Sequence, residues 1–139
     1  MSSRSKTDLD PEFAAKLVKL EAVLAKQGIK LLLTSGYRSY GEQDQLYAIG
    51  RTKPGKRVTN ARGGYSWHNF RLAADYAFVI NGKVTWDGPW DILGRTARSL
   101  GLEWGGDWRS LPDRPHIQMT KGRTLAQMRA FAAAKKAGG

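Results

Sequence analysis

Apolar residues recur at helical spacing in four stretches of the chain. In the first stretch they fall every three or four positions, at Phe13, Leu17, Leu20 and Leu24. Asp10-Pro11 before this stretch is typical of a helix start, and Gly28 after it is typical of a helix end. Similar starts and stops predict further helices over residues 39–50, 89–100 and from Thr124 onward.

Short apolar runs between these helices predict a sheet. Residues 29–34 and 72–80 are strand-like, and residues 116–119 form a third short run. Asn81-Gly82 is a strong hairpin signal, so residues 83–86 should return beside 72–80. The pattern therefore predicts an α+β fold in which helices flank a small, mainly antiparallel sheet.

Two stretches show neither the apolar spacing of a helix nor the apolar run of a strand. Residues 51–65 are rich in Arg, Lys and Gly, and residues 103–113 are rich in Trp and in turn-forming residues. We expect both to be loops, and long loops in compact domains often carry function. Because the 139 residues contain no repeat, residues 1–139 are predicted to form a single domain.

The chain is strongly basic. It has 23 Lys and Arg residues against 12 Asp and Glu residues, a net charge of +11. The excess favours a polyanionic partner, such as nucleic acid, an anionic envelope polymer or a membrane surface, although solubility alone would also account for it. Residues 1–7 are polar and no stretch is long and apolar enough to span a bilayer, so we expect no signal peptide.

The two histidines of the chain each lie near a carboxylate. Asp75 follows His68, and Asp113 precedes His116. Because there is no cysteine, disulfides and thiolate ligands are excluded, and any metal must bind histidine and carboxylate groups. Two imidazoles and one carboxylate would suit a catalytic zinc with one position left for water.

Spacing alone leaves other interpretations open. Seven residues on one straight strand would place His68 and Asp75 on opposite faces, so residues 69–71 must bend if the two side chains share a site. Otherwise both could be exposed surface residues, and Asp113 could simply cap a turn.

The order of these motifs resembles the zinc peptidases of the D-alanyl-D-alanine carboxypeptidase family. The resemblance is greater to the L-alanyl-D-glutamate endopeptidase branch, which occurs among phage endolysins and bacterial wall hydrolases. It extends over most of residues 29–119. The matching segments are Ser35-Gly36-Tyr37-Arg38-Ser39, the Gln43–Tyr47 helix, Ser66–Phe78, Trp104–Trp108 and Asp113-x-Pro115-His116.

The resemblance implies that His68, Asp75 and His116 bind Zn²⁺ at junctions between loops and strands. It also implies that Asp113 is the general base, which takes a proton from water and passes it to the leaving amine. We interpret this combination, in this order, as far more specific than any of the single motifs.

The resemblance also implies roles for residues around the metal. Arg38 would bind substrate at a carboxylate or at the polarised carbonyl, and Ser66 would offer a hydrogen bond to the substrate backbone. Gln118 would support a ligand histidine through its second ring nitrogen. The chain departs from the family pattern at Arg71, where glycine is usual, and at Ala74, where a bulkier residue is expected. We expect Arg71 to be tolerated if its backbone angles are ordinary, with its side chain in the cleft or in solvent. The alternatives are altered specificity, weaker metal binding or an engineered change.

The function implied is zinc-dependent endopeptidase hydrolysis of the L-Ala/D-Glu bond in peptidoglycan stem peptides, as by a phage endolysin during host lysis. Such a protein would be made in the host cytoplasm and would act on the wall after release. The sequence shows no separate cell-wall-binding domain, so the basic surface could contact the anionic envelope. We expect a monomer with no nucleic-acid partner.

Alternative functions are compatible with the same residues. A D,D-carboxypeptidase or dipeptidase of the same family would use the same metal site with a different cleft. A basic envelope- or nucleic-acid-binding protein with a degenerate site would hold no stoichiometric zinc. A purely structural zinc site is disfavoured, because closed structural sites usually contain thiolates.

Overall fold

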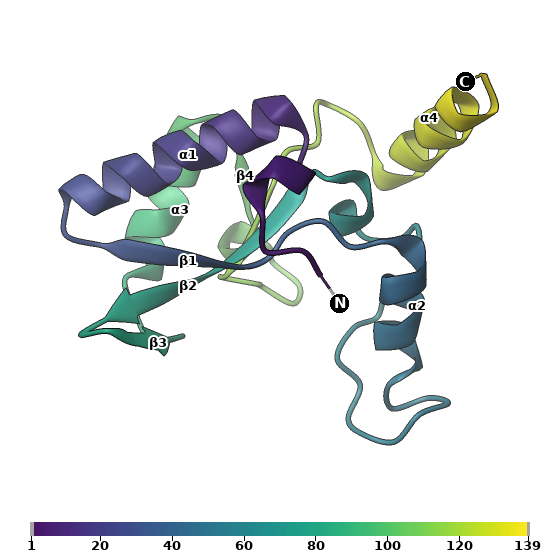
Figure 1. Ribbon diagram of the computed structural model, residues 1–139, viewed down its shortest axis with the longest axis horizontal. Helices are drawn as coiled ribbons and strands as arrows, with labels where there is room; N and C mark the ends of the chain where they lie inside the picture. Colours follow the sequence, from purple (N-terminus) through teal and green to yellow (C-terminus); the bar gives the residue numbers. More distant parts are fainter. Residues whose placement is uncertain (1, 139) are drawn as a thin grey trace.

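The structure is a computed structural model that describes residues 2–138 (Figure 1). The α+β prediction is confirmed, since helices flank a small antiparallel sheet. The α-helices are α1 (Pro11–Lys26), α2 (Tyr40–Ala48), α3 (Trp90–Ser99) and α4 (Leu125–Gly138). The strands are β1 (Lys30–Ser35), β2 (Ala73–Ile80), β3 (Lys83–Thr85), β4 (Glu103–Trp104) and β5 (His116–Gln118). Short 3₁₀ helices are η1 (Lys6–Asp8), η2 (Trp67–Phe70) and η3 (Gly105–Asp107).

β2 lies at the centre of the sheet. The strand order is β1-β2-β5-β4, with β3 also paired to β2, and all of these pairs are antiparallel. The predicted hairpin is confirmed, because Asn81 and Gly82 both have positive φ, 53° and 75°, as a tight hairpin turn requires. Across the ladders, Asp75 is paired with Ser35 on one side and with His116 on the other.

The hydrophobic core lies between one face of the sheet and helices α1 and α3. Tyr76 and Phe78 of β2 are fully buried in it. Because side chains alternate along a strand, Asp75 points to the opposite face together with Ala73 and Ala77. The carboxylate is thereby placed among small side chains and away from the core.

Gly94 allows α3 to approach β4 closely. A Cβ at this position would overlap the indole ring of Trp104, which is itself buried. The indole nitrogen of Trp104 donates a hydrogen bond of 2.7 Å to the carbonyl of Arg114. This packing holds the two ends of residues 103–113 together. The sequence predicts a loop throughout these residues, but they contain β4 and η3.

Helix α4 is only partly embedded in the molecule. The predicted cap is present, because the Thr124 hydroxyl accepts a hydrogen bond of 3.1 Å from the amide of Gln127. Met128 is buried, but Phe131 is 45% exposed, so the apolar side chains of α4 are only partly covered. Among the described residues, no helix combines the length and the apolar character needed to cross a bilayer.

Candidate active site

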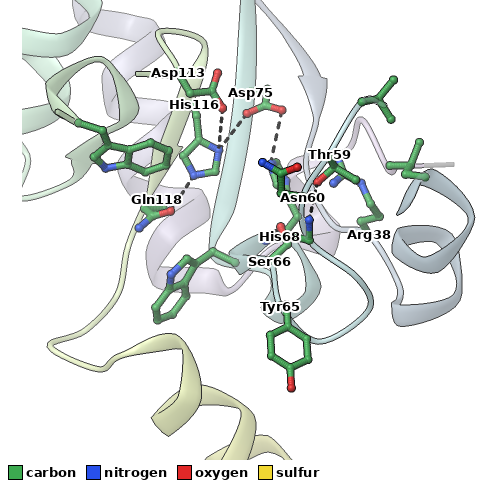
Figure 2. A pocket seen from close by; sticks show the side chains of 15 residues that line it. Arg38, Thr59, Asn60, Tyr65, Ser66, His68, Asp75, Asp113, His116 and Gln118 are labelled. Carbon is green, nitrogen blue, oxygen red and sulfur yellow. Dashed lines mark hydrogen bonds and ion pairs between the residues drawn. The ribbon is translucent and has the colours of Figure 1, made fainter. Parts of the chain in front are cut away.

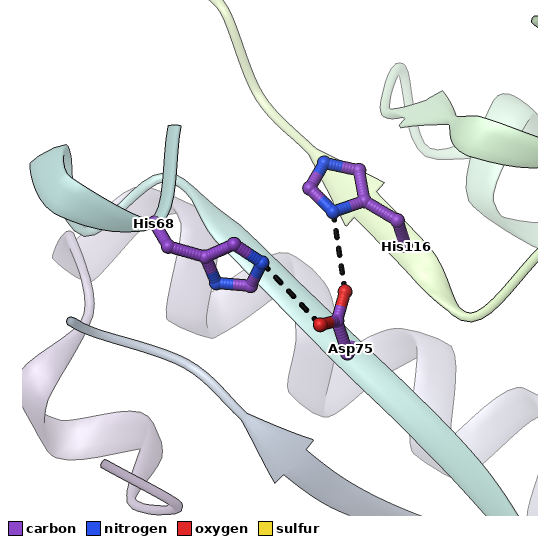
Figure 3. A group of neighbouring side chains, drawn as sticks. All are labelled: His68, Asp75 and His116. Atoms are coloured by element: carbon purple, nitrogen blue, oxygen red, sulfur yellow. Dashed lines mark hydrogen bonds and ion pairs between the residues drawn. The ribbon is translucent and has the colours of Figure 1, made fainter. Parts of the chain in front are cut away.

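His68, Asp75 and His116 converge on one point (Figure 3). Asp75 Oδ2 lies 3.4 Å from His68 Nε2, and Asp75 Oδ1 lies 3.1 Å from His116 Nδ1. One ligand atom from each of the three residues lies within 4.8 Å of the others. The three residues expected to bind metal are therefore brought together, although they come from η2, β2 and β5.

A bend between His68 and Asp75 makes this convergence possible. Ser66 caps η2, because its hydroxyl accepts a hydrogen bond of 3.3 Å from the amide of His68. Arg71 then ends η2 in the left-handed conformation, with φ 66° and ψ 25°. The expected bend over residues 69–71 is thus a short helix followed by a left-handed residue.

The outer ring nitrogen of His68 is held by the backbone. His68 Nδ1 lies 2.8 Å from the carbonyl oxygen of Gly36, which can only accept a hydrogen bond. The proton is therefore on Nδ1, and the lone pair of Nε2 faces Asp75. This fixed tautomer is the form that binds a metal.

His116 is held by a chain of two side chains. The amide nitrogen of Gln118 donates to Glu103 Oε2 at 2.7 Å, so its amide oxygen must face the ring. That oxygen lies 2.7 Å from His116 Nε2, which fixes a proton there and directs Nδ1 to Asp75. The predicted support from Gln118 is present, and Glu103 extends it.

The charges of the site suit a cation. Burial alone would raise the pKa of Asp75, but hydrogen bonds with His116 and His68 outweigh it and hold this pKa well below its ordinary value. Burial also opposes charging of His116, yet the hydrogen bond with Asp75 raises the pKa of that imidazole. The Nδ1 atom of His116 would give up the proton that Asp75 favours there on binding a metal ion. Two imidazoles and one ionised carboxylate fit Zn²⁺.

Asp113 lies beside the three converging residues. Its Oδ2 is 4.0 Å from His116 Nδ1, and its side chain is 48% exposed. Partial burial and the neighbouring charge of Asp75 raise the pKa of Asp113 above its ordinary value. The backbone amide of Asp113 donates a hydrogen bond of 2.9 Å to the carbonyl of Gly105, which fixes the start of this turn. The carboxylate is therefore placed where it could accept a proton.

The site opens into a cleft of about 710 Å³. Figure 2 shows Arg38 and Asn60 on one side of this cleft, and Asp113 and His116 on the other. The wall on the Asn60 side is formed by part of the 51–65 loop, which the sequence predicted to be functional. A peptide could enter this cleft, because it is open to solvent and of substrate size.

Polar side chains hold the 51–65 loop against the rest of the molecule. The buried amide of Gln43 donates a hydrogen bond of 2.7 Å to the carbonyl of Ala61. Asp44 accepts one of 2.7 Å from the amide of Gly63. The amide oxygen of Asn69 accepts one of 3.0 Å from the amide of Gly64.

Arg38 lines the cleft and is itself held in place. Its guanidinium donates to Gln43 Oε1 at 2.8 Å, to Ser35 Oγ at 2.9 Å and to Ser2 Oγ at 2.7 Å. Ser66 also lines the cleft, and its hydroxyl proton can be donated to a substrate while its oxygen caps η2. Both side chains are thus where substrate contact is expected, and each has a structural role as well.

Several residues that shape the site were not assigned from the sequence. Asn69 could have been found, because Ser66 and Asn69 have the spacing of a capping box, and both of its hydrogen bonds form. Gly36, Gln43 and Glu103 carry no comparable signal. Their roles depend on contacts between segments far apart in the chain.

Arg71 does not have ordinary backbone angles, so the condition under which we expected it to be tolerated is not met. Its φ of 66° is the left-handed geometry that glycine adopts without strain. The side chain does not line the cleft and is exposed to solvent, but two contacts hold it in place. It is stacked over the ring of Tyr37, 3.9 Å from its centroid, and donates a hydrogen bond of 2.7 Å to the carbonyl of Asp8. These contacts offset the strain, and His68, Asp75 and His116 still converge.

We expect Arg71→Gly to be more stable than Arg71→Ala by about 1 kcal/mol. Both variants lose the contacts with Tyr37 and Asp8, but only alanine keeps the left-handed strain, which costs about 1–2 kcal/mol. Urea unfolding of the two variants measures the difference. At the exposed Arg109, whose φ is not positive, the same pair should show alanine at least as stable as glycine. An Arg71→Ala variant as stable as Arg71→Gly would contradict the strain argument.

Comparison with known proteins gives one consistent result. Two family models, both described as D-alanyl-D-alanine carboxypeptidase, match residues 6–87 and 59–119. The peptidoglycan L-alanyl-D-glutamate endopeptidase CwlK of Bacillus subtilis is 42% identical over 124 residues, which cover 81% of this chain and 74% of that protein. The L-alanyl-D-glutamate peptidase of Listeria phage A118 is 33% identical over 89 residues, 58% of this chain and 31% of that protein.

Solved structures agree with the sequence matches. The L-Ala D-Glu endopeptidase ChiX of Serratia marcescens superposes with a TM-score of 0.58 at 26% identity, covering 86% of this chain and 89% of that one. The LD-carboxypeptidase LdcB superposes with a TM-score of 0.64 at 20% identity, which shows the shared fold. Together with the converging His68, Asp75 and His116, these matches show that the chain belongs to the D-alanyl-D-alanine carboxypeptidase family of peptidases.

Proposed function

We propose that this chain is a zinc-dependent endopeptidase that hydrolyses the L-Ala/D-Glu bond of peptidoglycan stem peptides, and that it serves as a phage endolysin. The observation that carries the proposal is the arrangement of His68, Asp75 and His116 beside Asp113, at the base of an open cleft. The choice of bond is supported by the similarity of this chain to the L-alanyl-D-glutamate peptidases of Bacillus subtilis and Listeria phage A118.

Three side chains would hold the zinc: His68 through Nε2, Asp75 through its carboxylate and His116 through Nδ1. When bound, Zn²⁺ supplies a Lewis acid that acidifies a water molecule and polarises the peptide carbonyl. Three protein ligands leave a coordination position for that chemistry, as catalytic rather than structural sites do.

Other residues would handle the proton and the substrate. The Asp113 carboxylate would take the proton of the attacking water and return it to the leaving amine, a role favoured by its raised pKa. Arg38 would hold a substrate carboxylate or the carbonyl region with its guanidinium, which its three hydrogen bonds keep oriented. Ser66 would donate to the peptide backbone.

Replacing Gln118 by alanine should weaken zinc binding by about 10–100-fold, the usual cost of losing a partner behind a ligand histidine. The reason is that His116 Nε2 would lose its only side-chain hydrogen bond among the described residues, so the ring could rotate or change tautomer. Competition with a chromogenic chelator measures the affinity. Gln45→Ala, at an exposed position of α2, is the matched control. Equal zinc affinity in both variants would show that Gln118 does not orient the ring.

Analysis of the products tests the proposed reaction. Purified peptidoglycan should release fragments with a new D-Glu amino terminus, detected by mass spectrometry, and a chelator should stop the release. A D,D-carboxypeptidase would instead liberate free D-Ala. A binding protein with a degenerate site would hold no stoichiometric zinc and produce no fragments. Free D-Ala without L-Ala/D-Glu cleavage would overturn the proposal.

Two further parts of the proposal concern the setting in which the protein acts. The protein would act on the wall after release from the host cytoplasm, and it would act as a monomer without nucleic acid. Light scattering at working concentration tests the monomer. The need for release from the cytoplasm is tested with cells that produce the protein internally. Such cells should lyse only after their membranes are permeabilised.

A further inference from the structure

The positive charge is concentrated in two segments of the chain. Residues 51–71 and 114–139 together contain 12 of the 23 Lys and Arg residues and no Asp or Glu. The rest of the chain contains 11 basic and all 12 acidic residues, and is therefore close to neutral. The net charge of +11 is thus a property of two segments and not of the whole surface.

Several arginines of these segments are held in place by aromatic rings. Arg51 stacks over Tyr47 at 3.8 Å, and Arg123 stacks over Phe131 at 4.1 Å. Within residues 2–138, Lys121 is the only Lys or Arg of the two segments in a salt bridge. A guanidinium that is stacked and has no carboxylate partner keeps some of its five N–H groups for an external anion, even where others are used, as when Arg51 donates to the carbonyls of Tyr47 and Thr59.

Tyr65 joins the two segments beside the cleft. Arg62 lies 4.6 Å from the centroid of its ring, and Arg129 of α4 lies 4.0 Å from it. Tyr65 also lines the cleft, and Figure 2 shows its hydroxyl directed away from His68 and Asp75. The arginines therefore extend from the mouth of the cleft along both segments. We call Arg51, Lys56, Arg57, Arg62, Arg123 and Arg129 the basic rim.

We propose that the basic rim binds a phosphodiester polymer of the bacterial envelope and so keeps the cleft at the wall. The charges are spread along two segments and do not converge on one pocket, which suits a repeating polyanion and not a small anion. Arginines already stack on the rings of Tyr47 and Tyr65, which leaves less of these rings for the base stacking used by single-strand binders. This binding is separate from hydrolysis. It rests on the proposed function only in that the protein must act at the cell wall, where the polymer is found.

The face of α4 also argues for a polymer and not for a membrane. Phe131 is the one large hydrophobic side chain exposed on the described part of α4, and Arg123 lies over it. An interfacial helix needs a broad apolar face, which α4 lacks.

A binding experiment without hydrolysis tests the proposal. The protein carries Asp113→Ala throughout, and its cosedimentation with bacterial cell walls is measured at several salt concentrations. The walls are used intact or after hydrofluoric acid has removed their phosphodiester polymers. The rim variant combines Arg57→Gln, Arg62→Gln and Arg129→Gln, with Arg62→Gln alone as a milder form. Circular dichroism establishes that each variant is folded.

The matched control removes the same charge elsewhere. Lys19→Gln, Lys30→Gln and Lys83→Gln lie on the exposed side of α1, at the start of β1 and on β3. The rim variant should bind intact walls about tenfold more weakly, with the salt slope reduced by about one for each lost contact, and the control should change less than about twofold. Walls treated with hydrofluoric acid should bind the Asp113→Ala protein weakly even when its basic rim is unchanged.

Three results would overturn the proposal. Equal weakening in the rim and control variants would mean that only net charge matters. Undiminished binding to acid-treated walls would mean that the protein recognises peptidoglycan itself. Displacement from walls by duplex DNA, more effective than by poly(glycerol phosphate) at equal phosphate, would identify the rim as a nucleic-acid surface. Because hydrolysis is not measured, these results are independent of whether the proposed zinc reaction holds.

Discussion

Replacing Asp75 by asparagine is expected to abolish stoichiometric zinc binding and reduce wall hydrolysis to background. Asp75 lies between the two imidazoles, 3.4 Å from His68 Nε2 and 3.1 Å from His116 Nδ1, and it carries the one negative charge among the three ligands. The amide has nearly the same shape but no charge. Because changes behind a ligand already cost about 10–100-fold in affinity, loss of a ligand charge should cost more than about 100-fold. Zinc content after dialysis and the clearing of wall suspensions measure the two effects.

A second aspartate provides the matched control. Asp107→Asn also replaces one carboxylate by an amide, but Asp107 is bonded to Arg98 on the surface and is 48% exposed. This variant should retain zinc and activity. If Asp75→Asn held one zinc per chain as firmly as Asp107→Asn, the assignment of Asp75 as a ligand would be wrong.

Replacing Asp113 by alanine should lower hydrolysis by about 10²–10⁴-fold, the usual contribution of a general base. Zinc content should be unchanged, because Asp113 Oδ2 lies 4.0 Å from His116 Nδ1 and the three ligands do not depend on it. The loss should appear mainly in kcat, since proton transfer occurs in the chemical step. Steady-state hydrolysis of a soluble stem peptide, together with the zinc content of the same sample, measures both quantities.

Asp87→Ala is the control for this substitution. Asp87 follows β3, does not line the cleft and should be replaceable without effect on turnover. An Asp113→Ala variant that hydrolyses the peptide as fast as Asp87→Ala would remove Asp113 from the mechanism. The zinc site could still stand, because its ligands are tested separately.

The larger elements could be predicted because their signals are local. Asp10 caps α1 by accepting a hydrogen bond from the amide of Phe13 in the first turn of the same helix, and Asn81-Gly82 determines its hairpin by backbone angles alone. β4 contains only Glu103 and Trp104, too few residues for any periodicity, and it forms because β5 pairs with it. Its presence therefore depends on a partner strand that sequence periodicity does not reveal.

The residues of the candidate site could be predicted from the sequence, but the way they are brought together could not. His68 and Asp75 share a site only because η2 and the left-handed Arg71 turn the chain between them. The pairing of Asp75 with His116 depends on a strand register across 41 residues. The support from Glu103 to Gln118 likewise connects two strands, and a side-chain relay of this kind leaves no pattern in a single sequence.

The attachment of the 51–65 loop has a consequence for how such enzymes diversify. Its anchors lie at its two ends, where Arg51 donates to the carbonyls of Tyr47 and Thr59 and Gln43 holds Ala61. The amides of Thr52 and Lys53 also donate to the carbonyl of Ala48. Residues 54–58 lie between these anchors and contribute no metal ligand. They could be exchanged with those of another peptidase as a cassette, with the reaction chemistry left unaltered. The cleft wall at Val58 can therefore change without altering the proposed zinc ligands.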